Sequence, residues 1–306
     1  MSDNVKISII GGDLRQLVAA RMFSENGIET AVHGFDLYCG DFSAVTKCRT
    51  PADCIHGSSA VILPLPCSVD DENVNTPLHD EKIPLSEIFC HVSDEQILCG
   101  GMINFCRPNS YDYYEREELK ILNAIPTAEG AIAIALDKMP ITLHGAKAVI
   151  LGYGRIGKAL AERLKGLGCH VTVCARKDSD LALCESSSYR AVHMRLLSEV
   201  VSDANVIFNT VPAVILNESI LDCVDFRTLI IDLAGKPGGI DFSAAEKCGL
   251  NVIQALSLPG KVAPETAGSI IYKTVNIILK QEVTDGFHRY SECLIFGIAI
   301  DAGRDQ

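Results

Sequence analysis

Three glycines, Gly152, Gly154 and Gly157, have the G-x-G-x-x-G spacing of a turn that binds the pyrophosphate of a dinucleotide. The first permits a tight turn, the second lets the pyrophosphate approach the backbone, and the third lets a helix pack closely on a strand. An apolar strand precedes the turn and a helical segment follows it, so N–H groups at the helix N-terminus are available to phosphates. The residues 147–177 therefore predict a dinucleotide site.

Two cations, Arg176 and Lys177, follow the second strand of this pattern. A site for NAD usually has an acidic residue at this corner, which accepts hydrogen bonds from the adenosine ribose. Neither cation can accept such bonds. Both can pair with a 2′-phosphate, and the guanidinium can do so through two parallel hydrogen bonds. The predicted cofactor is therefore NADP.

Further cofactor contacts are predicted from position along the chain. In an open parallel sheet, ligands bind beyond the carboxyl ends of the strands, and the stretch NTVPA at 209–213 follows one such strand. The predicted cofactor-binding residues are Gly152, Gly154, Arg155, Ile156, Gly157, Arg176, Lys177, Thr210, Val211 and Pro212.

Four side chains are candidates for catalysis because their segments are expected to reach the same crevice: Thr127, Glu129, Lys236 and Lys261. The two lysines suit the carboxylates of an anionic substrate. Glu129 is a candidate general base. The helix dipole alone also favours a carboxylate in the first turn of a helix, so a structural role for Glu129 stays open.

A second glycine turn, IIGGDLRQL at 9–17, lies near the N-terminus. It lacks the third glycine, and Asp13 would repel a phosphate. We expect Asp13 instead to cap the helix that follows, where an anion is favourable. No second nucleotide is predicted in this part of the chain.

Strands and helices alternate along the chain, as in proteins whose parallel sheet is covered by helices. Strands are expected at 6–12, 29–36, 59–66, 96–101, 170–176, 205–212, 228–235 and 251–260, and a further apolar strand is expected to open at Lys147. Helices are expected at 13–27, 126–139 and 265–283. The predicted fold class is α/β, with two Rossmann-like domains, parallel sheets and a cofactor cleft between them. The expected domains are a substrate-side domain at 1–142, an NADP-binding domain at 143–283, and a C-terminal helix at 284–306 that packs back or forms a subunit contact.

The composition restricts the class of protein. The net charge is −12 over 306 residues and there is no block of Lys or Arg, which argues against nucleic acid or an anionic membrane surface as a partner. None of the 13 cysteines is in a C-x-x-C pair, so no zinc or other metal site is predicted, and free thiols in a reducing cytoplasm are expected. The N-terminus does not resemble a signal peptide.

Several longer stretches of the sequence are more specific to one protein family than the glycine turn is. The stretches VHGFD, NAIPTAEGA, LGYGRIG, NTVPAVILN, DLAGKPGGIDF and LPGKVAPETAG, together with IIGGDLRQL, resemble the A subunits of dipicolinate synthase from endospore-forming bacteria. The resemblance covers residues 9–268. It implies oxidation of a dihydrodipicolinate-type ring to pyridine-2,6-dicarboxylate with NADP as hydride acceptor. It also implies a partner, a flavoprotein-like B subunit, and a role in sporulation, in the mother-cell cytosol.

Two other functions are compatible with the same residues. One is an enzyme like adenosylhomocysteinase, which recycles its cofactor internally, although such enzymes typically keep the acidic ribose corner. The other is a non-catalytic subunit that binds NADPH, because no acid–base residue is evident from the sequence alone. A homo-oligomer is also expected.

Overall fold

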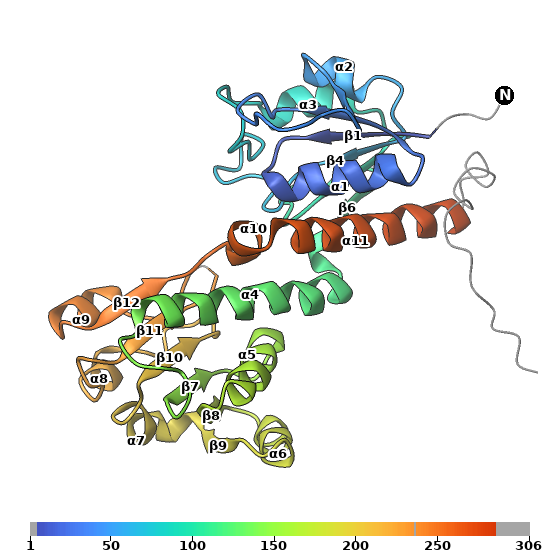
Figure 1. Cartoon of the computed structure of the whole chain (residues 1–306). Helices are drawn as coiled ribbons and strands as arrows, with labels where there is room; N and C mark the ends of the chain where they lie inside the picture. Colours follow the sequence, from blue (N-terminus) through green and yellow to red (C-terminus); the bar gives the residue numbers. More distant parts are fainter. Residues whose placement is uncertain (1–4, 236, 286–306) are drawn as a thin grey trace, which may run out of the picture. The chain divides into compact units, whose positions relative to one another are not determined.

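The computed structural model describes residues 5–235 and 237–285 of the chain (Figure 1). These residues form two compact units: the first contains residues 5–120 and 264–285, and the second contains residues 121–263. Each unit has its own six-stranded sheet, and every pair of neighbouring strands is parallel. The predicted α/β class with two Rossmann-like parallel sheets is confirmed. The predicted cleft between the domains stays a prediction.

The second unit has the sheet order β12-β11-β10-β7-β8-β9. Numbered within the unit, this is the order 3-2-1-4-5-6 read from β9, which is the order of the Rossmann fold. The direction of winding reverses between β7 and β10, and a ligand is expected beyond the carboxyl ends of these strands. The strands are β7 (Lys147–Leu151), β8 (His170–Ala175), β9 (Arg190–His193), β10 (Val206–Asn209), β11 (Leu229–Asp232) and β12 (Asn251–Gln254).

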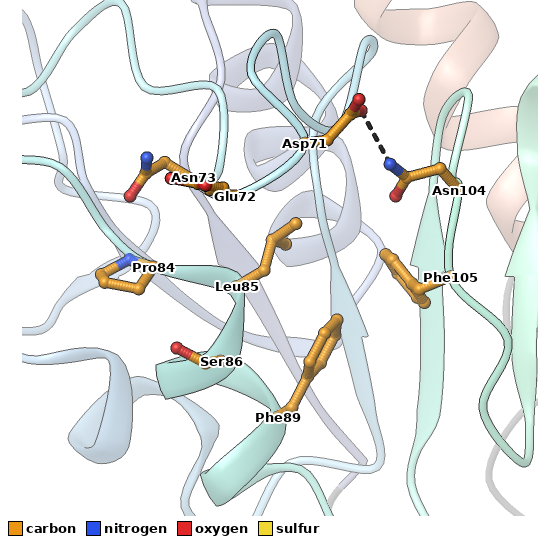
Figure 2. A pocket seen from close by; sticks show the side chains of 9 residues that line it. All are labelled: Asp71, Glu72, Asn73, Pro84, Leu85, Ser86, Phe89, Asn104 and Phe105. Atoms are coloured by element: carbon orange, nitrogen blue, oxygen red, sulfur yellow. Dashed lines mark hydrogen bonds between the residues drawn. The ribbon is translucent and has the colours of Figure 1, made fainter.

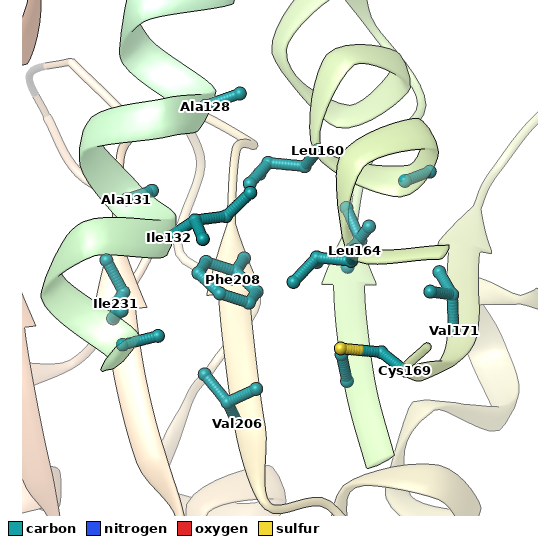
Figure 3. Packing of buried hydrophobic residues seen from close by; sticks show 14 of the residues in the cluster. Ala128, Ala131, Ile132, Leu160, Leu164, Cys169, Val171, Val206, Phe208 and Ile231 are labelled. Atoms are coloured by element: carbon teal, nitrogen blue, oxygen red, sulfur yellow. The ribbon is translucent and has the colours of Figure 1, made fainter. Parts of the chain in front are cut away.

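Helices cover both faces of this sheet because its central strands are apolar on both sides. Figure 3 shows the face on which Phe208 and Ile231 pack against alanines and Ile132 of α4 (Glu117–Lys138) and leucines of α5 (Arg155–Gly166). The other face packs against shorter helices. The remaining helices of the unit are α6 (Asp178–Ser186), η2 (Met194–Leu196), α7 (Leu197–Val201), α8 (Glu218–Leu221), α9 (Phe242–Lys247) and α10 (Leu258–Val262).

The first unit repeats this topology, with the sheet order β3-β2-β1-β4-β5-β6. Its strands are β1 (Lys6–Ile10), β2 (Glu29–His33), β3 (Thr46–Lys47), β4 (Ala60–Ile62), β5 (Ile97–Gly100) and β6 (Ser110–Asp112). Its helices are α1 (Leu14–Glu25), α2 (Pro51–Ile55), α3 (Leu85–His91), η1 (Tyr113–Glu115), the first turn of α4, and α11 (Pro264–Asp285). One face of the sheet packs on α1 and α11, and the other on α2 and α3.

The unit boundaries differ from the predicted domain boundaries. Helix α11 was assigned to a domain at 143–283, but it belongs to the first unit, where it packs along α1. The contact is close because Gly268 has no side chain: a Cβ there would lie 2.6 Å from the carbonyl oxygen of Arg15. The predicted helix at 284–306 lies outside the described residues, apart from the last turn of α11.

Helix α4 also departs from the prediction. It was expected to begin at Pro126 and instead begins at Glu117, with Pro126 inside it. The boundary between the units falls within it, after Lys120, rather than near 140–145. Its length and apolar composition would suffice to cross a membrane, but 44% of the apolar window is already buried in the protein core. Buried core helices share these properties, so this is weak evidence for a membrane span.

Candidate dinucleotide-binding site

The glycine turn of the second unit connects β7 to α5 at the point where the strand order reverses. Gly152 has a φ of +95°, a backbone conformation that favours glycine. A Cβ on Gly157 would lie 2.2 Å from the carbonyl oxygen of Gly152, so any side chain there would force helix and strand apart. Both glycines therefore have the structural roles predicted from their spacing.

Gly154 has a different role, because it is the N-cap of α5 and leaves the helix end open. A Cβ on this residue would meet no other described atom within 4 Å. Among the residues that the structure describes, no side chain caps the helix. The first N–H groups of α5 and the positive end of its dipole are thus left without a side-chain cap, which is the arrangement that favours an anion at a helix N-terminus. Arg155 is exposed in the first turn, and Ile156 packs partly against the core.

Arg176 and Lys177 follow β8 directly and both are exposed. Lys177 is the N-cap of α6 and makes no side-chain cap hydrogen bond within the described part of the chain. The two cations therefore lie at the corner where the adenosine ribose is bound in a Rossmann fold. That they contact a 2′-phosphate stays a prediction.

The stretch after β10 is placed beside the glycine turn. A Cβ on Gly152 would meet the Thr210 hydroxyl oxygen at 2.6 Å and the Val211 side chain at 2.9 Å. The Thr210 hydroxyl donates to the carbonyl oxygen of Leu151 at 2.8 Å, which attaches this stretch to the end of β7. Pro212 is exposed. The predicted contacts Thr210 and Val211 thus adjoin the predicted turn.

Tyr153 separates the first two glycines of the turn, and the centroid of its ring lies 6.4 Å from that of Tyr189, which follows α6. Burial raises the pKa of Tyr153, so its phenol is neutral at physiological pH. Burial likewise raises the pKa of the nearby Cys174 thiol to about 12. Every cysteine among the described residues is a free thiol. Within residues 5–235 and 237–285, no group of three or more His, Cys, Asp or Glu could hold a metal ion.

The predicted catalytic side chains make separate contacts. The Thr127 hydroxyl donates to the Asn123 carbonyl at 2.8 Å, and Arg163 donates to the Glu129 carboxylate at 3.3 Å. Lys261 donates to the Leu256 carbonyl at 3.0 Å. In the part of the chain that the structure describes, no hydrogen bond or ion pair joins Thr127, Glu129 and Lys261. Lys236 lies outside the described residues.

Sequence reasoning missed two buried polar residues, Asn209 and Asp232, at the ends of β10 and β11. Both are 0% exposed, and the Asn209 amide donates to the Asp232 carboxylate at 2.7 Å. They occupy facing positions in the ladder between the two strands. The only available sequence signal was that each is a polar residue ending an apolar strand.

The glycine turn of the first unit is closed. Asp13 caps α1 and forms a capping box with Gln16, as predicted for a helix entry. Asp13 also accepts two parallel hydrogen bonds from the buried Arg15 guanidinium, at 2.9 Å each. The N–H of Gly12 donates to the Asn75 carbonyl. The expected capping role of Asp13 is confirmed.

A pocket of about 500 Å³ also lies in the first unit, beside the loops that follow β4 and β5 (Figure 2). The side chains of Leu85, Phe89 and Phe105 line its apolar part, and Asn104 donates to Asp71 across its edge at 2.7 Å. It contains none of the predicted cofactor or catalytic residues.

The second unit thus combines a parallel sheet in the Rossmann order with an open glycine turn at its switch point, which defines a nucleotide-binding domain of the dehydrogenase type. The family model for the NAD binding domain of D-isomer specific 2-hydroxyacid dehydrogenases matches residues 127–229. This match supports a nicotinamide cofactor.

The first unit identifies the family more narrowly. The family model for the N-terminal domain of dipicolinate synthase A subunits matches residues 6–122. The dipicolinate synthase A subunit of Bacillus subtilis (strain 168) is 32% identical over 292 residues, which cover 92% of this chain and 98% of that protein. The chain belongs to the family of dipicolinate synthase A subunits, and the resemblance noted in the sequence is confirmed.

Two solved structures of dipicolinate synthase A subunits resemble the chain over most of its length. The crystal structure of the dipicolinate synthase A subunit from Bacillus halodurans has a TM-score of 0.84 and 33% identity, covering 91% of this chain and 99% of that one. The crystal structure of its counterpart from Bacillus subtilis has a TM-score of 0.82 and 32% identity, covering 92% of this chain and 98% of that one.

Proposed function

We propose that the chain is the oxidoreductase subunit that forms dipicolinate from a dihydrodipicolinate-type precursor, with NADP as hydride acceptor. The observation that supports this most is the open N-terminus of α5 beside two exposed cations, in a chain of the dipicolinate synthase family. The first feature suits a pyrophosphate, and the second suits a 2′-phosphate.

In this proposal, each part of the second unit has a defined task. The N-terminus of α5 at Gly154 binds the pyrophosphate, and Arg176 and Lys177 bind the 2′-phosphate. Thr210 and Val211 lie next to the turn and support the cofactor on its other side. When bound, NADP supplies an acceptor for one hydride from a ring carbon. The loss of that hydride and of one proton converts the dihydropyridine ring to a pyridine.

The substrate carries two carboxylates, whereas the protein has a net charge of −12. Binding therefore requires local cations that offset the general repulsion. We propose Lys236 and Lys261 for this role. Glu129 is the proposed acceptor of the ring proton, and the Thr127 hydroxyl is proposed to orient the substrate.

Turnover of the purified chain tests the proposal. The precursor, generated in the same vessel, is mixed with NADP, and both reduced cofactor and dipicolinate are measured. We expect them to form in equal amounts, and more slowly with NAD. Formation of dipicolinate at an unchanged rate without NADP would contradict the proposal.

The second candidate is a non-catalytic subunit that binds NADPH. The contacts of Thr127 and Glu129 favour it, because each of these side chains already has a protein partner. In that case, the chain binds NADPH, but the same assay shows no turnover of NADP at any concentration of precursor. The two candidates are therefore distinguished by a single measurement.

The relatives with the highest identity given above are A subunits, which supports the existence of a second kind of subunit. We propose that this partner is a flavoprotein-like B subunit, that the chain also forms a homo-oligomer, and that both function in the mother-cell cytosol during sporulation. Co-purification of the two proteins, each with its own tag, tests the first point, and light scattering of this chain by itself tests the second.

A further inference from the structure

Asn209 and Asp232 connect two loops at the carboxyl edge of the second sheet. The Asn209 amide group donates to the Asp232 carboxylate at 2.7 Å and to the Val211 carbonyl at 3.2 Å. Its oxygen accepts from the Val211 N–H at 3.1 Å. Asn209 thus determines the direction in which the chain leaves β10.

Asp232 does the same for the chain that leaves β11. Its two carboxylate oxygens accept from the N–H of Ala234 at 3.2 Å and from the N–H of Gly239 at 3.4 Å. The second contact brings Gly239 close to the end of β11. Asp232 therefore contacts the chain on both sides of residue 236, through Ala234 and Gly239.

Gly239 also joins the two loops directly. A Cβ on this glycine would lie 1.9 Å from the Asn209 amide nitrogen and 2.6 Å from the Val211 carbonyl oxygen. Its own carbonyl oxygen accepts from the N–H groups of Ile215 and Leu216. Gly239, after β11, is consequently held against the stretch that follows β10, so a shift of one would move the other.

A fully buried carboxylate is costly unless hydrogen bonds satisfy it. Among the described residues, Asp232 forms no ion pair, and it accepts hydrogen bonds from the amide of Asn209 and from two backbone N–H groups. These N–H groups reach it only while Ala234 and Gly239 keep these positions. The stability of the carboxylate is thus linked to the positions of these two residues.

The location of these loops indicates what they position. The adenosine half of a dinucleotide lies over the first strands of a Rossmann sheet, here β7 and β8, and the other half crosses the switch point towards β10 and β11. We propose that Asn209 and Asp232 are positioning residues. They hold Val211 after β10, and Ala234 and Gly239 after β11, in the positions required by the nicotinamide half of the cofactor. This inference rests on the proposed function, because it requires that the chain binds NADPH.

The test compares two ligands on Asp232→Asn by calorimetric titration of the full chain. Replacing one carboxylate oxygen by an amide puts a donor opposite an N–H group. NADPH should bind roughly 10- to 150-fold more weakly, by the range for a hydrogen bond to a charged group. Adenosine 2′,5′-bisphosphate, which lacks the nicotinamide half, should bind within about twofold of wild type, since distant sites act independently.

Thr228→Val is the matched control. Thr228 is also buried, and its hydroxyl donates to the Ala204 carbonyl at 2.7 Å, at the opposite end of β11. The variant loses a buried hydrogen bond from the residue that precedes the same strand but should bind both ligands as wild type does. Thermal unfolding of both variants then shows that reduced stability is not the cause of the reduced affinity.

Asn209→Asp provides a second test, because the NADPH affinity of this variant should depend on pH. Two carboxylates then face each other, and their repulsion raises the pKa of one of them. Once protonated, the new carboxyl group can donate to Asp232 as the amide did. The affinity of this variant for NADPH should therefore rise about tenfold relative to wild type as the pH falls from about 8 to about 5.

Each outcome has one meaning. A selective loss of NADPH affinity together with the recovery at low pH supports the inference. If Asp232→Asn binds NADPH as tightly as wild type, or loses both ligands equally while folded, the positioning role is wrong and the proposed function is unaffected. If wild type binds neither ligand, the proposed function itself is overturned, and the inference with it.

Discussion

The two units have the same strand order and a glycine turn after the first strand, yet only one of these turns is open. In the first unit, Asp13 caps α1, and the Gly12 N–H donates to the Asn75 carbonyl from the loop after β4. In the second unit, Gly154 caps α5 without a side chain, and a Cβ there would meet no other described atom within 4 Å. The same topology therefore produces a closed helix end in one unit and an anion site in the other.

The difference depends on one residue position and one loop. The carboxylate of Asp13 occupies the place where a phosphate would approach the helix N-terminus, and Arg15 holds it there. The loop after β4 covers the same turn, because Val74 and Thr76 lie where a Cβ of Gly11 would be. A Rossmann-like topology consequently does not predict a nucleotide unless the helix end is also open.

The largest expected effect is that of Gly154→Asp, which places the cap of the first unit in the second. The backbone at this position, with φ −77° and ψ −164°, suits any residue, and an N-cap aspartate is favourable for a helix. The fold should therefore persist. A carboxylate at the phosphate position should weaken NADPH binding at least about 1,000-fold, or ~4 kcal/mol, because like charges in close contact cost several kcal/mol.

Gly154→Asn is the control for Gly154→Asp, since it has the same shape without the charge. It should lose less affinity than the aspartate variant. Calorimetric titration with NADPH measures both variants, and thermal unfolding measures their stability. An aspartate variant that binds NADPH like wild type would show that phosphates do not bind at this helix end.

The reverse change, Asp13→Ala, removes the cap of the first unit. It leaves Arg15, whose side chain is 7% exposed, without its carboxylate partner. Loss of a largely buried pair and of a helix cap should destabilise the protein by about 2–4 kcal/mol, discounted for the partial exposure of Asp13. Denaturant unfolding measures this change.

Asp13→Ala should not open a second nucleotide site, because the Gly12 N–H and the loop after β4 still occupy the turn. The NADPH stoichiometry should remain one per chain. Binding of two nucleotides by the variant would show that the cap alone kept the first turn closed.

Much of the difference between the two glycine turns was predicted from the sequence. The spacing of Gly152, Gly154 and Gly157 and the position of Asp13 were sufficient, because helix caps and tight turns depend on local residues. The boundaries of α4 and the place of α11 were missed, since Pro126 suggested a helix start and the packing of α11 on α1 is a contact between distant segments. The Asn209–Asp232 pair could not be predicted for the same reason: its two members are joined only by the register of β10 and β11.

The residues that follow the second strand also differ between the two units: one is acidic and the other is a cation. Arg176→Ala tests whether this difference matters for cofactor binding. In the first unit, the acidic residue Asp36 follows β2 and pairs with Lys47 and His79. In the second unit, Arg176 follows β8. Removing it should weaken NADP binding roughly 10- to 150-fold, since a hydrogen bond to a charged group contributes about 1.5–3 kcal/mol. NAD binding should change little, and equal losses for both cofactors in calorimetry would show that Arg176 does not contact the 2′-phosphate.

The smallest effect is expected for Lys177→Ala. Lys177 is exposed next to Arg176, and its ammonium is a flexible point charge rather than a planar group that forms two parallel hydrogen bonds. An exposed ionic contact contributes about 0.2–1 kcal/mol, so NADP affinity should fall by no more than about fivefold. The loss should shrink further in high salt, because exposed charges are screened within about 10 Å at 0.1 M ionic strength. Titrations of both single variants and the double variant at two salt concentrations measure this. A larger loss for Lys177→Ala than for Arg176→Ala would mean that the 2′-phosphate lies at the N-terminus of α6 and not beside the guanidinium.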